Sequence, residues 1–112
     1  MKIAFTAKGI GWDAMIDSRF GRTSYLLIYD DVTDTFEHID NRAVADEGHG
    51  AGPLTARKLF DVRPDVLVTG NGPGGNAAMI LAKAGIQIYI GAGEMRVREA
   101  FDCYRSGKLK AF

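Results

Sequence analysis

Short apolar runs, separated by glycine, proline and polar residues, divide this chain into alternating strands and helices. Lys2–Ala7, Ser24–Asp30 and Val66–Val68 are compact apolar runs typical of strands covered on both faces. Thr35–Asp40 and Ile86–Ile90 alternate between apolar and polar positions, which predicts two more strands. The pattern therefore predicts five strands.

The segments between the later strands have helical spacing. The sequence predicts a helix with Pro53 in its first turn that ends at Arg63, because the residue before Pro64 avoids the helical region. Further helices are expected over Ala77–Ala84, where Gly85 suits the C-terminal end, and over Glu94–Ser106. The expected buried faces are Leu54, Leu59, Phe60 and Val62 in the first helix, and Val97, Ala100, Phe101 and Tyr104 in the last.

The resulting order, β-β-β-α-β-α-β-α, defines the expected fold class. Strands joined by a short connection, such as Ser24–Asp30 and Thr35–Asp40, pair antiparallel, whereas strands joined by a crossover helix lie parallel. The sequence thus predicts an α/β fold with one mixed five-stranded sheet, antiparallel in its N-terminal hairpins, parallel in its C-terminal strands and flanked by helices. A chain of 112 residues with no long linker is expected to form a single domain over residues 1–112.

Composition narrows the class of protein. The 14 basic and 14 acidic residues cancel, which argues against general nucleic-acid binding. The single cysteine, Cys103, excludes an intrachain disulfide and a Cys-x-x-Cys metal motif, and it is expected to be a packing residue in the last helix. Neither a secretory signal nor a membrane-spanning segment is evident, so a cytoplasmic location without a membrane partner is expected.

The glycine-rich loop between Val66–Val68 and the following helix is the first candidate site. Residues Gly70–Gly75 formally satisfy G-x-G-x-x-G, between a strand and a helix, where open α/β sheets bind ligands. Pro73 removes one backbone donor, and no Gly-Lys-Ser/Thr follows to make a Walker A loop. Two interpretations stay open, a tight turn that needs glycine and a cradle for an anion or cofactor. The candidate cofactor-binding residues here are Gly70, Asn71, Gly72, Gly74, Gly75 and Asn76.

Two other loops carry candidate ligand-binding side chains. His49 lies between glycines in the polar loop Asn41–Gly52, so it is either a metal ligand or an exposed loop histidine. Arg19 and Arg22 lie in the long irregular segment Lys8–Thr23, where they either meet an anionic ligand or remain solvated, with Phe20 as an anchor. No spacing supports a Ser-His-Asp set or a pair of catalytic carboxylates, so no catalytic residue is predicted.

The order of several motifs resembles the dinitrogenase iron–molybdenum cofactor biosynthesis family over nearly the whole chain. That family includes small cofactor carriers of nitrogenase assembly, a domain of the radical enzyme that builds the cofactor precursor, and many short stand-alone proteins. The motifs are Ile3-Ala-Phe5, Arg19-Phe-Gly-Arg-Thr-Ser-Tyr25, Gly48-His-Gly-Ala-Gly52, Pro64-Asp-Val-Leu-Val-Thr-Gly-Asn-Gly-Pro-Gly-Gly-Asn-Ala77, Ala84-Gly-Ile-Gln-Ile-Tyr89, Val97-Arg-Glu-Ala-Phe101 and Ser106-Gly-Lys-Leu109.

The resemblance implies a ribonuclease H-like arrangement and a role in binding an iron–sulfur or iron–molybdenum cofactor and passing it on. Carried over, the ligand-facing candidates are His49 and Gly70–Gly75. The family often has His-Phe-Gly where this chain has Arg19-Phe-Gly, so a metal ligand is replaced by a permanent cation. The resemblance therefore implies His49 as the metal ligand and Arg19 as part of a charged pocket for an anionic cluster.

Two functions from different classes follow. The first is a non-catalytic carrier or assembly chaperone for such a cluster or a small anion, working with a cofactor-assembly protein. The alternative is a small enzyme or sensor that binds a phosphorylated or nucleotide ligand at Gly70–Gly75. A ribonuclease H-like nuclease is disfavoured, because the central strands carry no clustered carboxylates. The first hypothesis requires the loops that carry Arg19, His49 and Gly70 to meet at one edge of the sheet.

Overall fold

The computed structural model describes all 112 residues and contains one mixed sheet with the strand order β3-β2-β1-β4-β5-β6. The antiparallel pairs β1–β2 and β2–β3 and the parallel pairs β1–β4 and β4–β5 follow the prediction. The strands are β1 (Lys2–Ala7), β2 (Tyr25–Asp30), β3 (Thr35–Asp40), β4 (Val66–Val68), β5 (Gln87–Ile90) and β6 (Lys110–Ala111).

The sheet has six strands, so the prediction of five was wrong. The missed strand, β6, has two exposed residues and pairs antiparallel with the end of β5, where Tyr89 faces Ala111. A segment this short has no hydrophobic period, and only its position beside β5 makes it a strand. The ribonuclease H-like arrangement implied by the resemblance stays a prediction.

Four helices complete the fold: α1 (Arg42–Ala45), α2 (Ala51–Val62), α3 (Gly75–Lys83) and α4 (Val97–Arg105). The short α1 lies in a segment that the sequence predicted to be a loop. The last helix starts at Val97 rather than Glu94, because Glu94 adopts a left-handed conformation with φ of 66°. None of these helices is both long enough and apolar enough to traverse a lipid bilayer.

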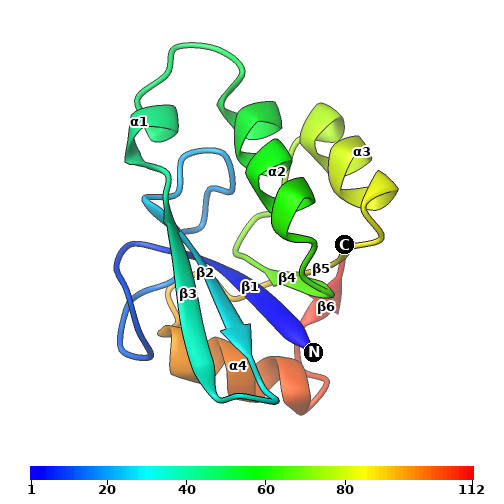
Figure 1. Ribbon diagram of the computed structural model, residues 1–112. Helices are drawn as coiled ribbons and strands as arrows, with labels where there is room; N and C mark the ends of the chain where they lie inside the picture. The colour runs from blue at the N-terminus through cyan, green and yellow to red at the C-terminus, as the bar shows by residue number, and fades with distance from the viewer.

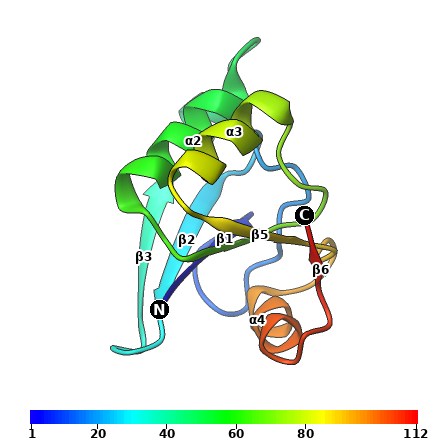
Figure 2. The ribbon, with the colours of Figure 1, turned by 90° about the vertical axis from the view of Figure 1, so that its right-hand side faces the viewer.

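The helices cover both faces of the sheet, with α2 and α3 side by side on one face and α4 on the other (Figures 1 and 2). The central strand β1 contributes to both cores, since Ile3 and Phe5 pack in the cluster beneath α4 whereas Ala4 packs in the cluster beneath α2 and α3. A strand buried on both faces explains its continuous apolar sequence.

The buried face of α2 differs from the prediction. Its buried residues are Ala51, Thr55, Ala56 and Leu59. Leu54 is 43% exposed, and Phe60 and Val62 are only partly buried. Small residues form most of this face, so its helical period is hidden in a search for large apolar side chains. In α4 the prediction is confirmed, with Val97 and Ala100 fully buried and Phe101 and Tyr104 packed beside them.

The observed burial of α2 predicts that truncating one of its two leucines lowers stability strongly, whereas truncating the other changes it little. Leu59→Ala should lower the free energy of unfolding by about 2–5 kcal/mol, because it leaves a cavity beneath α2. Leu54→Ala should change it by no more than about 0.5 kcal/mol, since that side chain is largely exposed. Urea denaturation of the two variants tests this, and an equal loss in both would contradict the observed orientation of α2.

Candidate functional site

The three loops singled out in the sequence meet at one edge of the sheet. The parallel strands β1, β4 and β5 end at this edge, and β3, which runs in the same direction, ends there as well. The connections that leave it are residues 8–24, 69–74, 91–96 and 41–50. Ligands of open α/β sheets bind at such an edge, because helix N-termini and flexible loops gather there.

Close backbone contacts hold these loops together. A Cβ atom on Gly70 would lie 2.6 Å from the Cα atom of Ser18, and one on Gly93 would lie 2.9 Å from the Ser18 Oγ atom. A Cβ atom on Gly21 would lie 2.8 Å from the backbone nitrogen of Gly52 at the start of α2. Glycine is therefore needed for space at Gly70 and Gly21, where the close atoms belong to the backbone, and the packed loops form one continuous edge.

Buried hydroxyl and amide groups reinforce the same edge. The Thr6 and Thr69 hydroxyls lie 2.7 Å apart across β1 and β4, and the Thr6 hydroxyl also donates to the backbone oxygen of Asp17 at 2.7 Å. The Asn41 amide nitrogen donates to the backbone oxygen of Thr23 at 3.1 Å and to the Thr55 hydroxyl at 3.0 Å. These buried bonds fix where each loop leaves the sheet. The Asn41 side-chain oxygen, in contrast, is buried without a hydrogen-bond partner.

A polar cleft of about 570 Å³ opens at this edge beside α1. Three of its side chains are cationic and two are acidic, so the charged groups within it carry a net positive charge at neutral pH. Its lining residues are Lys8, Asp17, Arg19, Arg22, Ser24, Ala45 and Asp46.

The segment that carries Arg19 and Arg22 contains both buried and solvent-exposed side chains. Phe20 is 2% exposed in the core beneath α2 and α3, as the anchor role predicted for it requires, and Thr23 is fully buried. Arg19 is exposed, and its backbone N–H donates to the carboxylate of the buried Asp17 at 3.2 Å. Arg19 and Arg22, neither of which is buried, both line the cleft.

The two arginines differ in what they contact. The Arg22 guanidinium donates to the backbone oxygen of Ala45 at 2.8 Å and to that of Glu47, so it is already bonded to the chain. The Arg19 guanidinium makes no hydrogen bond or ion pair within the chain and is free to meet a ligand.

Near α1, Arg42 pairs with Asp40 on the surface at 2.7 Å, and hydrogen bonds from Arg42 lower the pKa of that carboxyl to about 2. Both partners are exposed, so this pair adds little to the stability of the segment.

The starts of α2 and α3 form a second feature of the edge. Neither helix has a side-chain cap on its first-turn N–H groups, and both begin with glycine at the capping position, Gly50 and Gly74. A Cβ atom on Gly52 would lie 3.6 Å from that of Ala77, so the two first turns are neighbours. Uncapped helix starts carry partial positive charge and favour anions.

The predicted glycine loop leads directly into α3. Gly70 is buried against Ser18, and the Asn71 backbone N–H donates to the Ser18 oxygen at 2.9 Å. Gly72, with φ of 90°, lies beneath the Phe112 ring. Four residues of the loop and helix start are exposed to solvent: Asn71, Gly74, Gly75 and Asn76.

The structure thus brings the predicted segments to one edge but does not line one hollow with all of them. Arg19 lines the cleft, whereas His49 and Gly70–Gly75 do not. His49 is exposed in the connection between α1 and α2 and makes no hydrogen bond within the chain. Sequence reasoning missed five lining residues, namely Lys8, Asp17, Ser24, Ala45 and Asp46. Lys8 carried a usable signal, because it directly follows the predicted first strand.

The arrangement of possible metal ligands is sparse. No three histidine, cysteine, aspartate or glutamate side chains lie close enough together to hold a metal ion. Cys103 lies on α4, on the other face of the sheet from α2 and α3, and is partly buried. The role of His49 as a metal ligand stays a prediction.

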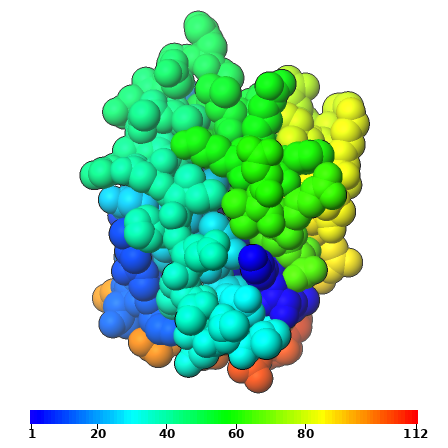
Figure 3. Space-filling view, viewed as in Figure 1, coloured from blue at the N-terminus to red at the C-terminus, as the bar shows by residue number.

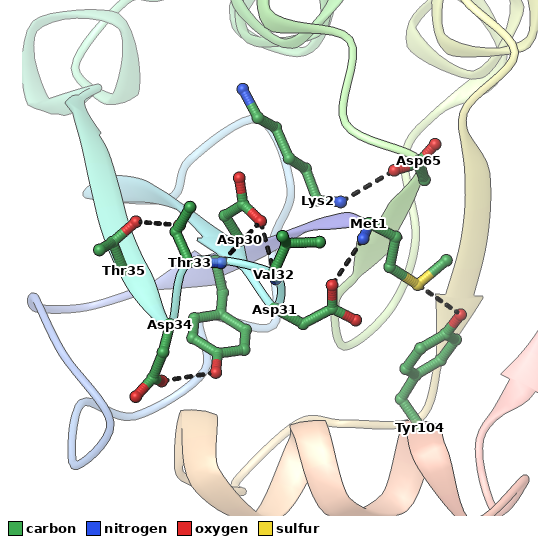
Figure 4. Close-up of polar contacts among 11 residues, drawn as sticks. Met1, Lys2, Asp30, Asp31, Val32, Thr33, Asp34, Thr35, Asp65 and Tyr104 are labelled. Atoms are coloured by element: carbon green, nitrogen blue, oxygen red, sulfur yellow. Dashed lines mark hydrogen bonds and ion pairs between the residues drawn. The ribbon is translucent and has the colours of Figure 1, made fainter.

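At the opposite edge of the sheet, where β1 and β4 begin, several carboxylates form hydrogen bonds or an ion pair within the chain (Figure 4). Asp31 pairs with the Met1 amino group at 2.5 Å, and Asp65 accepts the Lys2 backbone N–H at 2.8 Å. Asp30 accepts the Val32 backbone N–H at 2.9 Å. The carboxylates at this edge are therefore bonded within the chain, one of them in an ion pair.

Comparisons with known proteins agree with this architecture. The family model described as "Dinitrogenase iron-molybdenum cofactor" matches residues 1–107. The chain is similar to the apo form of the orange protein from Desulfovibrio gigas, with 34% identity and a TM-score of 0.91, covering 99% of this chain and 92% of that one. It is also similar to a putative NifB protein from Thermotoga, with 30% identity and a TM-score of 0.82, covering 98% and 91%. A search among curated proteins gave no match.

The contact between Ser18 and Gly70 makes a specific prediction. Gly70→Ala should lower the free energy of unfolding by about 1–3 kcal/mol, because the added methyl group overlaps the Ser18 backbone. Gly75→Ala is the matched control, since this residue is exposed in the first turn of α3 and a Cβ atom there meets nothing within 4 Å; it should be neutral or stabilising by up to about 1 kcal/mol. Equal stability of the two variants in thermal denaturation would contradict the close packing of these loops.

Proposed function

The chain belongs to the dinitrogenase iron–molybdenum cofactor family, and from this membership and the cationic cleft we propose that it is a non-catalytic carrier for an anionic metal–sulfur cluster. In this proposal an iron–sulfur or iron–molybdenum cluster is cargo, which the protein receives from a cofactor-assembly protein in the cytoplasm and passes on. The observation that carries the proposal is the cleft of about 570 Å³ with Lys8, Arg19 and Arg22 in its lining.

The side chains near the cleft are better suited to hold a cluster by electrostatic attraction than by direct metal ligation. Clusters fixed permanently in proteins are bound by several cysteine thiolates, whereas this chain has one cysteine, on α4. The cleft offers guanidinium and ammonium donors, which bind anions through charge-assisted hydrogen bonds. The neighbouring starts of α2 and α3 add backbone N–H groups of the same polarity.

A cargo held in this way can be released. Each contact from an exposed cation is weak and is screened by salt, so no single bond retains the cluster. In this proposal His49 would supply one imidazole ligand from the exposed connection before α2. One ligand together with surface charge is compatible with transfer to a partner that offers stronger ligands.

Anaerobic titration with a soluble iron–sulfur cluster tests the proposal. Arg19→Gln should weaken binding about fivefold, because an exposed charge contact contributes about 1 kcal/mol. Raising the salt concentration should weaken the wild type more than the variant. Arg57→Gln, which removes the same charge from an exposed position of α2 outside the cleft, should leave the affinity unchanged.

His49→Ala in the same titration separates ligation from charge. Loss of the cluster's absorption changes in this variant would support an imidazole ligand, whereas unchanged binding would restrict the site to the cationic cleft. Failure of the wild type to bind any cluster would contradict the proposed function.

A second candidate function is favoured by the start of α3. The exposed Gly74, Gly75 and Asn76, together with the absence of a side-chain cap, leave the first N–H groups of this helix open to an anion. A phosphate of a nucleotide or sugar phosphate could bind there, which would make the protein a small enzyme or a sensor.

Thermal shift measurements with nucleotides and sugar phosphates test this alternative. A ligand at one hundred times its dissociation constant should stabilise the protein by about 2.7 kcal/mol. Gly74→Asp should abolish the rise in melting temperature by repelling phosphate. Gly74→Asn, an equally good capping residue without the charge, should reduce that rise far less. No shift with any of these ligands would exclude the alternative for the compounds tested.

A further inference from the structure

The segment between Asn41 and Ala51 is a long connection whose two end residues are buried. At its start, Asn41 is fully buried, and its backbone N–H donates to the Ser24 oxygen at 2.8 Å. At its end, Ala51 is 6% exposed, and the next residue, Gly52, lies against Gly21. The residues between these points, 42–50, cross the edge of the sheet beside the cleft.

Residues 42–50 bury few of their side chains. The helix α1 has four residues, none of them buried and none providing a side-chain cap. Residues 46–50 are all exposed, and they include two glycines. Figures 1 and 3 show the connection between α1 and α2 projecting at the top of the molecule. A segment with few buried contacts opens easily unless something else holds it.

Arg22 supplies the missing support. Its guanidinium donates to the backbone oxygens of both Ala45 and Glu47, and these are the contacts that join the middle of the segment to another loop. The other backbone bonds of residues 45–47 stay within the segment or return to its first residue. These bonds, together with the packing of α1 against α2, therefore hold the end of α1 in place.

Arg22 itself projects from a rigid position. Thr23 beside it is buried, and its hydroxyl donates to the Ala7 oxygen at 3.1 Å. On the other side, Gly21 is packed against the backbone of Gly52 without room for a Cβ atom. Because the backbone on both sides of Arg22 is fixed, its guanidinium can hold the backbone carbonyl groups of Ala45 and Glu47 in place.

We propose that Arg22 is the positioning residue of the cleft, which holds residues 42–50 as one of its walls. Ala45 and Asp46 line the cleft, so the bonds from Arg22 to Ala45 and Glu47 set its width. The same bonds fix the direction in which the chain continues to His49. The consequence for cargo rests on the proposed function, whereas the ordering of the segment does not.

Arg19 provides the matched comparison. It lines the same cleft, carries the same charge and is three residues away, but its guanidinium bonds to nothing in the chain. Arg19→Gln therefore removes charge from the cleft alone, whereas Arg22→Gln removes the same charge together with the support of residues 42–50. Arg22→Lys keeps the charge, but its ammonium group is one bond closer to the backbone than Nη1, the single nitrogen that bonds both carbonyl oxygens.

Amide hydrogen exchange of the cargo-free protein, followed by NMR, tests the inference. The reporters are the N–H groups of Ala45, Asp46 and Glu47, which donate to Asn41, Arg42 and Val44. In Arg22→Gln and in Arg22→Lys they should exchange about tenfold faster or more, as expected for losing a hydrogen bond from a charged donor. In Arg19→Gln they should exchange as in the wild type. Unchanged exchange in both Arg22 variants would overturn the proposal.

Cluster binding by the same variants supplies the second readout. Arg22→Lys should lose affinity although it keeps the charge, and Arg22→Gln should lose more because it removes both charge and support; full affinity in the lysine variant would overturn the proposal. If the wild type binds no cluster, the proposed function fails, and the exchange rates alone then decide the role of Arg22. Exchange at the buried strand β1 should match the wild type in every variant, which shows that the fold is retained.

Discussion

The packing of Ser18 against two glycines is the constraint on which the functional edge depends. Gly70 and Gly93 follow neighbouring parallel strands, and both leave space that the Ser18 backbone and hydroxyl occupy. Because a backbone approaches so closely, the long connection after β1 lies flat over the ends of β4 and β5. The arginines that follow Ser18 are thereby directed toward the β2 side of the edge, where the cleft opens.

Charge is distributed unevenly between the two edges of the sheet. At the edge where β1 begins, acidic side chains pair with the Met1 amino group and with backbone N–H groups. At the opposite edge, Arg19 has no partner, and two helix starts lack side-chain caps. A protein with no net charge thus has one locally cationic region, and net charge alone could not reveal it.

The edge also separates two kinds of anion site. The cleft offers cationic side chains and a buried carboxylate, Asp17, whereas the starts of α2 and α3 offer backbone donors. Gly21 connects them, because it adjoins Arg22 and packs against the first turn of α2. A large anionic cargo suits the first and a phosphate suits the second, which is why two functions can be argued from one edge. Membership of the family favours the cluster.

Local chemistry in the sequence determined most of the elements. The double burial of β1 makes its sequence continuously apolar, and the left-handed Gly85, with φ of 74°, ends α3 where the sequence places its stop. The anchoring of Phe20 and the inner face of α4 were also predictable, because large apolar side chains mark buried positions. Some of the motif glycines that identified the family, Gly21 and Gly70, occupy places where a Cβ atom would overlap the backbone of another loop.

Tertiary structure alone decided the rest. The strand β6 exists because β5 offers an unpaired edge, and the inner face of α2 is made of small residues that only close packing against α3 explains. The cleft joins Lys8 and Asp17 to Ala45 and Asp46, residues far apart in the chain, so no local spacing indicates it. The different roles of Arg19 and Arg22 follow from which carbonyl oxygens lie within reach, and that depends on how two distant loops meet in space.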